Sequence, residues 1–210
     1  MKTRLASVLE EDATLEIYRR FALDILDTLL RGHLALRIFF YPPEAGRKVR
    51  DWLGSEHRYV AQQGEDLGER MKNAFLSAFN EGFSRVVLIG SDLPDLPLRF
   101  VKEAVAALSS SDAVVGPARD GGYYLIGFNA NRFPQDVFRD IDWGTPTVFQ
   151  ETSRVLQGQG YDVWTLPQWD DIDTYEDLLR FMCNHESTPE GHLTTLDYLR
   201  ARARKQYDEV

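Results

Sequence analysis

Apolar positions along the chain follow two periods, one typical of amphipathic helices and the other of strands. The helical spacing predicts helices at 12–31, 44–53, 66–81, 97–108, 146–157 and 174–183, and a polar, partly basic helix at about 192–207. Short apolar runs predict strands at 34–41, 58–61, 85–90, 113–116, 123–128 and 161–166. Because strands alternate with helices, we expect an α/β fold whose mostly parallel central sheet carries helices on both faces.

Composition narrows the class of protein. The 210 residues contain no repeats or convincing linkers, so we expect a single domain over 1–210. A net charge of −9 and a pI near 5.0 argue against a nucleic-acid partner or an anionic membrane surface. The one cysteine, Cys183, allows no internal disulfide, and four scattered histidines lack zinc-ligand spacing. With no signal peptide and no apolar run near the ~20 residues of a membrane span, we expect a cytoplasmic protein.

Residues 86–94 read Val-Val-Leu-Ile-Gly-Ser-Asp-Leu-Pro, a buried strand that stops at a turn of small residues. Ser91 and Asp92 then lie at the C-terminal edge of that strand, where open α/β sheets bind ligands. A carboxylate at this edge is a hard oxygen ligand suited to Mg²⁺ or Mn²⁺ on a diphosphate. The alternative is a turn aspartate that caps the next helix.

A second acidic segment spans residues 170–177, Asp-Asp-Ile-Asp-Thr-Tyr-Glu-Asp. One interpretation is structural, with Asp173 as the N-cap of a helix and Asp177 in its first turn. The segment nevertheless holds more carboxylates than a cap requires, and like charges this close repel unless a divalent cation relieves the repulsion. We therefore expect Asp171 or Asp173 to share a metal with Asp92, and Asp173 could cap the helix as well.

Glycines mark two further segments. Residues 64–71 read Gly-Glu-Asp-Leu-Gly-Glu-Arg-Met and begin a helix after a strand. Their glycines would let backbone N–H groups approach an anion or a nucleobase closely. A simple turn is the alternative interpretation of the same pattern. Gly121 and Gly122 separate two strands, as in a tight turn or plain hairpin. Tyr123 and Tyr124 then alternate faces, so one should point into a pocket or the core and the other away.

Two loops add candidate contacts to an acceptor and to the phosphates. Residues 142–145, Asp-Trp-Gly-Thr, lead into a helix, and the tryptophan is either a packing anchor or a cover for a sugar ring or other acceptor. Lys2 and Arg4 place two cations on an amino-terminal loop. They suit phosphate neutralisation, or they are simply a solvated basic end.

Six segments occur together in the order known from one protein family: 2–5, 64–71, 90–94, 120–127, 143–145 and 171–174. On these segments the chain resembles the bacterial glycosyltransferase-like family with a GT-A fold, whose members are provisionally named nucleotide-diphospho-sugar transferases. That family is more distantly similar to the guanylyltransferases of molybdenum-cofactor and deazaflavin-cofactor (phospholactate) synthesis. The resemblance covers nearly the whole chain and implies a Rossmann-like mixed sheet that binds a nucleotide at its strand C-termini.

The resemblance implies a metal-dependent transferase of a nucleoside diphosphate sugar, with Mg²⁺ or Mn²⁺ held by Asp92, Asp171 and Asp173. The implied nucleotide contacts are Lys2, Arg4, Gly64, Asp66, Leu67, Gly68, Arg70, Ser91 and Asp92. The implied contacts to an unknown small-molecule acceptor are Gly121, Gly122, Tyr123, Trp143, Gly144 and Thr145. If the reaction inverts the anomeric centre, Asp120 or Asp142 would be the general base.

One departure from the family pattern concerns the amino terminus. Related sequences begin with a hydrophobic strand and a Pro/Gly-rich loop that runs into the Lys-Thr-Arg-Leu segment, whereas this chain starts at Met1 inside that loop. We expect the first central strand to be missing and the chain to be part of a longer protein. The loss would leave two unpaired ladder edges in the sheet.

Two other functions stay open. A guanylyltransferase-like nucleotidyltransferase would use the same metal site to join an NTP to a phosphorylated acceptor. Such an enzyme should have cations near its acceptor, and the candidate acceptor segments offer only Arg119, which favours a neutral acceptor. The third possibility is a catalytically weak nucleotide-binding protein. The oligomeric state stays open in each case.

Overall fold

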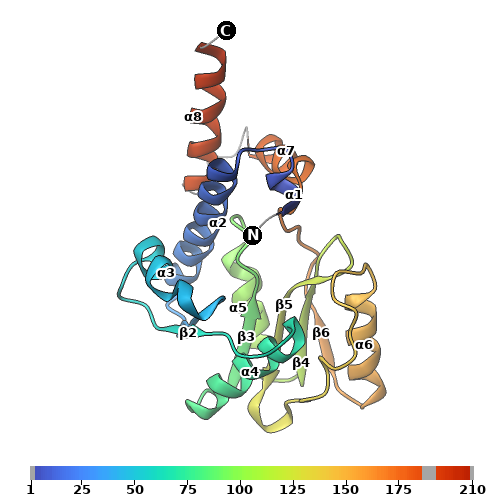
Figure 1. The fold of residues 1–210 in the computed structure, drawn as a ribbon. Coiled ribbons are helices and arrows are strands. Elements are labelled where there is room, and N and C mark those ends of the chain that lie inside the picture. The colour runs from blue at the N-terminus through green and yellow to red at the C-terminus, as the bar shows by residue number, and fades with distance from the viewer. Residues whose placement is uncertain (1–2, 186–192, 209–210) are drawn as a thin grey trace. The chain divides into compact units, whose positions relative to one another are not determined.

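The computed structural model describes residues 3–185 and 193–208 (Figure 1). The chain divides into two compact units. The helical unit comprises Met1–His33, Ser91–Leu96 and Asp171–Val210, and the sheet unit comprises Leu34–Gly90 and Pro97–Asp170. The expectation of one domain over the whole chain stays a prediction, and each unit is described by itself.

The larger sheet of the sheet unit has four strands in the order β3-β5-β4-β6. They are β3 (Arg85–Ile89), β4 (Ala113–Pro117), β5 (Tyr123–Asn129) and β6 (Val163–Thr165). Strand β5 runs antiparallel to both β3 and β4, whereas β6 is parallel to β4. The α/β prediction is therefore confirmed, with the antiparallel strand β5 making the sheet a mixed one.

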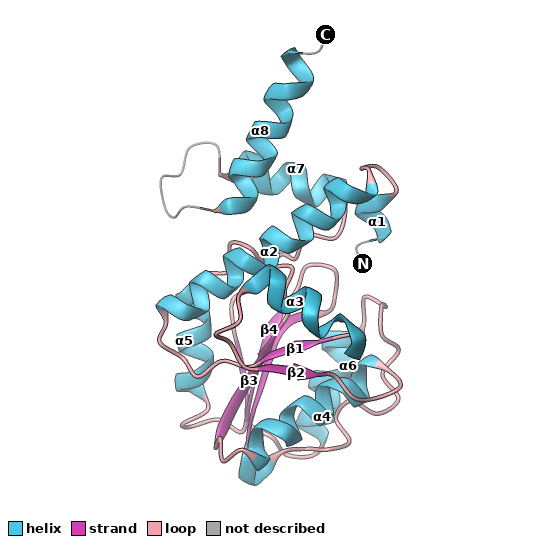
Figure 2. Cartoon of the chain, turned by 60° about the vertical axis from the view of Figure 1, so that its left-hand side comes forward, coloured by secondary structure: helices cyan, strands magenta, loops and turns pink. Residues whose placement is uncertain are grey.

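Two shorter strands, β1 (Ile38–Phe40) and β2 (Tyr59–Ala61), form a separate parallel pair (Figure 2). Within the described ranges β1 and β3 each have one partner strand, and both keep their apolar side chains only half buried. Strand β4 by contrast is buried over Ala113–Gly116, as expected for a strand paired on both sides. Strands β2 and β6 also have one partner strand each within the described residues, and the expected loss of a first central strand stays a prediction.

Helices cover both faces of the four-stranded sheet. One face packs against α4 (Leu67–Asn80) and α6 (Val148–Gly158), and the other against α5 (Leu98–Ala107). The core of the first face is aromatic, with the ring of Phe75 5.2 Å from Phe128 and 5.3 Å from Phe133, centroid to centroid. A short η1 (Pro43–Ala45) leads into α3 (Gly46–Leu53), and η2 (Ala130–Arg132) follows β5.

The helical unit contains α1 (Thr3–Ala6), α2 (Glu11–Arg31), α7 (Tyr175–Asn184) and α8 (Thr194–Asp208). Its core gathers apolar side chains from each of these helices and from the segment before α7; its buried members are Leu5, Ile17, Phe21, Ile172, Leu178, Phe181, Leu196 and Leu199. Helix α8 runs antiparallel to α2, because Asp24 contacts Thr194 while Arg20 stacks on Tyr198, 4.9 Å from the ring centroid.

The predicted elements match the observed ones closely, and the largest differences are at strand ends. The run predicted as a strand at 34–41 pairs only over Ile38–Phe40, and the one at 161–166 only over Val163–Thr165. The predicted C-terminal helix at 192–207 is observed as α8, although residue 192 lies outside the described residues. None of the helices described here is long and apolar enough to span a membrane.

Helix α7 begins with a capping box. Thr174 Oγ1 accepts a hydrogen bond from the Asp177 N–H, and the Asp177 carboxylate accepts one from the Thr174 N–H at 2.7 Å. The N-cap is therefore Thr174, and the interpretation of Asp173 as the cap is wrong. Only the backbone of Asp173 takes part, donating its N–H to Asp177 at 3.2 Å.

Helix α8 begins against a carboxylate from another helix. Asp24 in α2 is 3% exposed, and its oxygens accept hydrogen bonds from the N–H and hydroxyl of Thr194 and from the Thr195 N–H, at 2.8–2.9 Å. The carboxylate thus satisfies backbone donors that the first turn of any helix leaves unpaired. This contact links two segments 170 residues apart in sequence.

We expect Asp24→Ala to lower the free energy of unfolding by about 2–3 kcal/mol, because three donors lose a charged acceptor in a buried place. Urea denaturation followed by circular dichroism measures the change. Asp27→Ala is the matched control, because Asp27 lies on the same helix in an exposed ion pair with Arg31 and should cost less than about 0.5 kcal/mol. Equal losses in both variants would contradict the capping role.

We expect the contribution of Asp177 to stability to depend on pH. Burial alone would raise the pKa of Asp177, but hydrogen bonds from Thr174 and Asp173 and the charge of Arg180 lower it below its usual value. A carboxyl whose pKa is lowered by folding stabilises the protein above the pKa of the unfolded chain, about 3.9, and this stabilisation disappears as pH falls through the folded value.

Asp177→Ala should therefore lower the free energy of unfolding by about 1–2 kcal/mol at pH 7, and by progressively less below about pH 4. Urea denaturation at pH 7 and pH 3.5 tests this. Glu176→Ala, in the same helical turn but exposed, serves as the control. A difference between wild type and Asp177→Ala that stays constant with pH would contradict the assignment.

Candidate active site

The loop that follows β3 carries the first candidate ligand. Three residues after the end of β3 the chain reaches Asp92, which is half buried, while Leu93 and Leu96 beside it are 0% and 1% exposed. These two leucines fix the loop by burial. The Tyr18 hydroxyl, from α2, forms a hydrogen bond with Ser91 Oγ at 3.0 Å. Asp92 therefore lies between a hydrogen-bonded Ser91 and a buried Leu93.

The second candidate segment is attached to the first by its backbone. The Ile172 N–H donates a hydrogen bond to the Asp92 carbonyl at 3.2 Å, and the Ile172 side chain is 3% exposed in the core of the helical unit. Consecutive side chains along an extended chain point to opposite sides. With Ile172 turned into the core, Asp171 and Asp173 share the other side, and this explains the Asp-Ile-Asp spacing.

Three carboxylates converge as a result. One oxygen from each of Asp92, Asp171 and Asp173 lies within 4.8 Å of the other two, and all three residues are half buried. Around an octahedral Mg²⁺ with bonds of about 2.1 Å, neighbouring ligand oxygens lie about 3.0 Å apart and opposite ones about 4.2 Å apart. The donor type, the number of donors and their spacing therefore fit Mg²⁺ or Mn²⁺.

The cations predicted at the amino terminus are only partly described. Lys2 lies outside the described residues. Arg4 belongs to α1, so the segment expected as a loop is a short helix here. Leu5 beside it is fully buried in the core of the helical unit, whereas Arg4 is exposed. The geometry leaves the Arg4 side chain accessible to a ligand, and its role in phosphate binding stays a prediction.

In the sheet unit, the segment predicted to contact a nucleotide is residues 64–71, called the nucleotide loop below. Three side chains of α4 hold its start. Asn73 donates to the Gln63 carbonyl at 2.9 Å, Arg70 Nε to the Gly64 carbonyl at 3.1 Å, and the Glu69 carboxylate accepts from the Glu65 N–H at 2.9 Å. The loop therefore has a fixed backbone. Asp66 caps α4, its carboxylate accepting from the Glu69 N–H at 2.8 Å.

The two glycines of this segment have identifiable structural reasons. Gly64 has φ +135°, which is a conformation that other residues rarely adopt. A Cβ on Gly68 would lie 2.6 Å from the Phe138 carbonyl oxygen and 3.2 Å from the Trp143 ring. Gly68 is thus required where α4 packs against the 138–143 segment, whether or not it also approaches a nucleotide. Leu67 beside it is 47% exposed.

The Gly121–Gly122 pair forms the tight turn that the sequence predicts. Asp120 accepts the Gly122 N–H at 2.9 Å, and Gly121 has φ +92° with its Cβ position 2.0 Å from the Pro146 carbonyl oxygen. The Gly121 carbonyl accepts from the Phe149 N–H at 2.9 Å. The turn is therefore clamped against the start of α6, and Asp120 is exposed at its tip.

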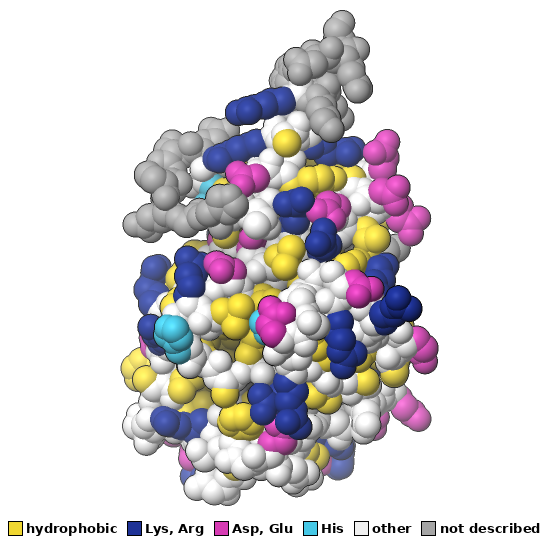
Figure 3. Space-filling model, turned by 90° about the vertical axis from the view of Figure 1, so that its left-hand side faces the viewer, with side chains coloured by type: hydrophobic (Ala, Val, Ile, Leu, Met, Phe, Trp, Pro, Cys, Tyr) yellow, Lys and Arg dark blue, Asp and Glu magenta, His cyan; other side chains and the backbone are white. Residues whose placement is uncertain are grey.

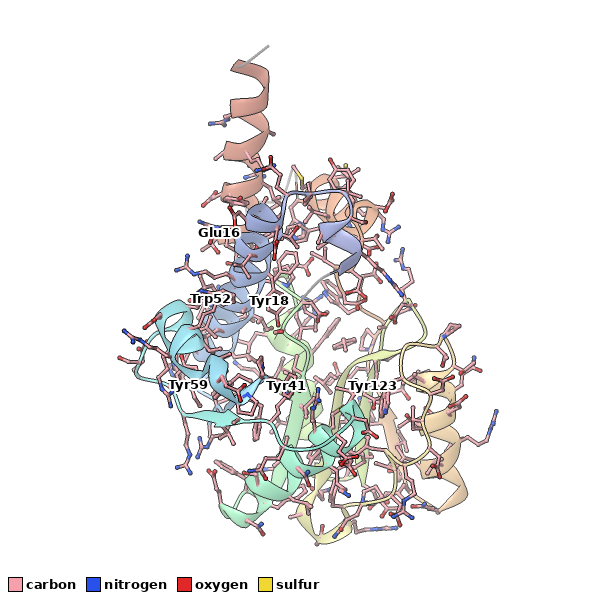
Figure 4. All side chains as sticks on the ribbon, in the orientation of Figure 1. Glu16, Tyr18, Tyr41, Trp52, Tyr59 and Tyr123 are labelled. Atoms are coloured by element: carbon pink, nitrogen blue, oxygen red, sulfur yellow. The ribbon has the colours of Figure 1, made fainter. Side chains whose placement is uncertain are left out.

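The two tyrosines after the turn point to opposite faces of β5, and both are covered. The Tyr123 ring, labelled in Figure 4, lies 6.3 Å from the Trp143 ring. Burial raises the pKa of the Tyr123 phenol. Tyr124 donates to the Pro167 carbonyl at 3.0 Å, and burial, with a smaller contribution from Glu103, raises its pKa to about 12. Neither phenol is suited to proton transfer near pH 7, and acceptor binding by Tyr123 stays a prediction.

The Asp-Trp-Gly-Thr loop is anchored by its tryptophan. Trp143 packs on the core with its ring 6.4 Å from that of Phe138, in agreement with the packing interpretation. Thr145 Oγ1 donates to the Asp142 carbonyl at 2.9 Å, and Gly144 has φ +94°. The Asp142 side chain is exposed, so within this loop it is the carboxylate open to a substrate.

Charged side chains of both signs share the surface of the molecule. On the face shown in Figure 3, Lys and Arg side chains are scattered among acidic and hydrophobic ones. The one cation of the candidate acceptor segments, Arg119, forms an ion pair with Asp170 at 3.1 Å.

Two residues of possible importance were not singled out by the sequence. Tyr18 contacts the Asp92 loop, but a tyrosine on the apolar side of a predicted helix carries no signal of that contact. Tyr41 is 56% exposed and stacks with Arg70, whose guanidinium carbon lies 3.8 Å from the ring centroid. A tyrosine directly before two prolines, at a strand end, was the signal available in the sequence.

Comparison with known proteins agrees with this fold. A crystal structure of a protein from Desulfovibrio desulfuricans G20, provisionally named a nucleotide-diphospho-sugar transferase, is 42% identical over 99% of this chain and 91% of its own, with a TM-score of 0.92. More distant structures share the fold alone. They are a 4-diphosphocytidyl-2C-methyl-D-erythritol synthase from Anaerococcus prevotii DSM 20548 (15% identity over 76% and 86% of the chains, TM-score 0.56) and a CMP:2-keto-3-deoxy-manno-octonic acid synthetase complexed with CTP (10% identity over 77% and 85%, TM-score 0.53).

No curated protein matches the chain. The model of one family, described as an uncharacterized protein conserved in bacteria (DUF2064), matches residues 25–145. That match covers more than half of the chain and includes the nucleotide loop, Asp92, the glycine turn and the Asp-Trp-Gly-Thr loop. The chain therefore belongs to this bacterial family, and its fold is that of its nucleotide-diphospho-sugar transferase relative.

Proposed function

We propose that the protein is a metal-dependent transferase that moves a sugar from a nucleoside diphosphate sugar to a small neutral acceptor. The convergence of Asp92, Asp171 and Asp173 is the observation that carries the proposal. The 42% identical relative supports a transferase of this kind. A divalent cation bound by these carboxylates would stabilise the charge that develops on the diphosphate leaving group.

The chain's own residues have separate tasks in this proposal. Asp92, Asp171 and Asp173 supply oxygen ligands, and the buried Ile172 keeps two of these ligands on one side of the chain. Lys2 and Arg4 are proposed to neutralise phosphate oxygens. The rigid loop at 64–70 is proposed to contact the base or ribose, where its fixed backbone avoids an ordering cost on binding.

The acceptor is proposed to contact the glycine turn at 120–123 and the loop at 142–145. Asp120 and Asp142 are both exposed, so either carboxylate is available as the general base of an inverting reaction. Tyr123 and Trp143 would then act through their packing rather than through proton transfer, because both are partly buried against the core of the sheet unit.

The charge near the proposed acceptor segments favours glycosyl over nucleotidyl transfer. A phosphorylated acceptor would require free cations, and Arg119 already pairs with Asp170. The distant fold relatives include enzymes named for cytidylyl chemistry, which keeps nucleotidyl transfer as the second candidate. A panel of ligands separates the two, since a preference for an NTP over every NDP-sugar would select nucleotidyl transfer.

We expect Mn²⁺ with one NDP-sugar, and with its matching NDP, to raise the melting temperature of the wild type in a thermal-shift panel of NTPs, NDPs and NDP-sugars. Saturation at about 100 times Kd stabilises a folded protein by about 2.7 kcal/mol. Asp92→Asn should lose this metal-dependent shift. Without metal it should remain folded, because asparagine keeps the size of the half-buried Asp92 side chain.

Asp170→Asn is the control, since Asp170 belongs to the same acidic segment but pairs with Arg119. It should keep the full metal-dependent shift. An unchanged shift in Asp92→Asn would remove that residue from the metal site. A large loss of stability in metal-free Asp92→Asn would show that the residue has a structural task instead.

A further inference from the structure

The carboxyl end of the β1/β2 pair presents an exposed aromatic ring. Tyr41 directly follows β1, and the Phe40 carbonyl before it accepts the Gln62 N–H at 2.9 Å. Tyr41 and the start of the nucleotide loop therefore leave the small sheet at the same edge, the edge at which open α/β sheets bind ligands. Tyr41 is 56% exposed, although large apolar and aromatic side chains mostly lie in the core.

The Tyr41 ring is held by a cation that is itself fixed. The Arg70 guanidinium carbon lies 3.8 Å from the ring centroid, and its Nε and Nη2 donate to the Gly64 and Glu65 carbonyls at 3.1 and 3.2 Å. Arg70 thus covers part of the ring while more than half of the tyrosine surface stays open. The ring is pre-positioned, so a flat ligand stacking on it need not order a mobile side chain.

The surroundings of this ring favour a neutral flat ligand over a phosphate. Glu65 and Asp66 directly precede α4, and Glu69 lies beside Arg70 in its first turn, so three acidic residues surround this one cation in the sequence. Leu67, one helical turn before Arg70, is 47% exposed and adds apolar surface. An apolar, aromatic surface beside hydrogen-bonding loop atoms suits a nucleobase, which has a π-face and a polar edge.

We propose that Tyr41, stacked on Arg70, is the platform on which the nucleobase of the donor binds. The assignment rests on the proposed function, because it requires a nucleotide ligand. It adds to that function a recognition residue at the end of β1, in front of the loop at 64–70.

The test compares nucleotides with and without a base. Dissociation constants for ADP, GDP, CDP and UDP, and for base-free ribose 5-diphosphate, are measured by calorimetry with Mn²⁺ for the wild type, Tyr41→Ala and Tyr41→Phe. For the best nucleotide, Tyr41→Ala should bind about 5- to 150-fold more weakly, the factor that base–aromatic stacking supplies. Tyr41→Phe should stay within about threefold, and binding of ribose 5-diphosphate should not change in either variant.

Trp164→Ala is the matched control, because Trp164 is another exposed aromatic residue of the sheet unit, 45% exposed and hydrogen-bonded to Glu103. It should bind nucleotides as the wild type does. Unchanged nucleotide binding in Tyr41→Ala would overturn the platform alone, as would an equal loss for ribose 5-diphosphate. A wild type that binds none of the nucleotides with Mn²⁺ would instead overturn the proposed function, and the platform with it.

Discussion

A single backbone hydrogen bond, from the Ile172 N–H to the Asp92 carbonyl, decides where the charged groups of the helical unit lie. It joins two segments that are far apart in the sequence, and burial of Ile172 fixes which way the second segment faces. Asp171 and Asp173 must then point toward Asp92. One oxygen of each carboxylate lies within 4.8 Å of the other two, so burial of Ile172 and this hydrogen bond together bring three oxygen donors to one place.

The rest of the helical unit can be understood as support for that arrangement. Thr174 and Asp177 start α7 directly after Asp173. Because Thr174 and Asp177 form the capping box, the Asp173 carboxylate is not used in the cap. Helix α2 provides Tyr18 for the Ser91 hydroxyl and Asp24 for the start of α8. In the sheet unit, α4 holds the nucleotide loop in a similar way. Its Glu69, Arg70 and Asn73 side chains form hydrogen bonds with the loop backbone.

The sequence predicted most helices and strands and the acidic residues of the candidate site, but it did not predict the structural role of every residue. The period of apolar residues located each helix of eight residues or more, because the apolar face of such a helix is a local sequence pattern. The four-residue α1 was expected as a loop, because it is too short to show that period. Asp92 with Asp171 and Asp173 was found because carboxylates at a strand end and before a helix are unusual in number. The cap was misassigned to Asp173, since a threonine and an aspartate one residue apart are both good caps and only geometry distinguishes them.

Contacts between segments far apart in the chain could not be predicted from the sequence. Gly68 was interpreted as a ligand-approach glycine, whereas the Phe138 carbonyl and the Trp143 ring already require it. The Tyr41–Arg70 stack joins a strand end to a helix further along the chain, and neither residue signals the other. The separation of β1 and β2 from the four-stranded sheet likewise depends on pairing, which apolar runs do not specify.

The central claim is that three aspartates bind one divalent cation, and anomalous diffraction at the manganese edge tests it most directly. Crystals grown with Mn²⁺ and a nucleoside diphosphate should show one strong anomalous peak, with oxygens of Asp92, Asp171 and Asp173 about 2.2 Å from it. A peak bound by other residues, or no peak in crystals that contain the nucleotide, would contradict the account.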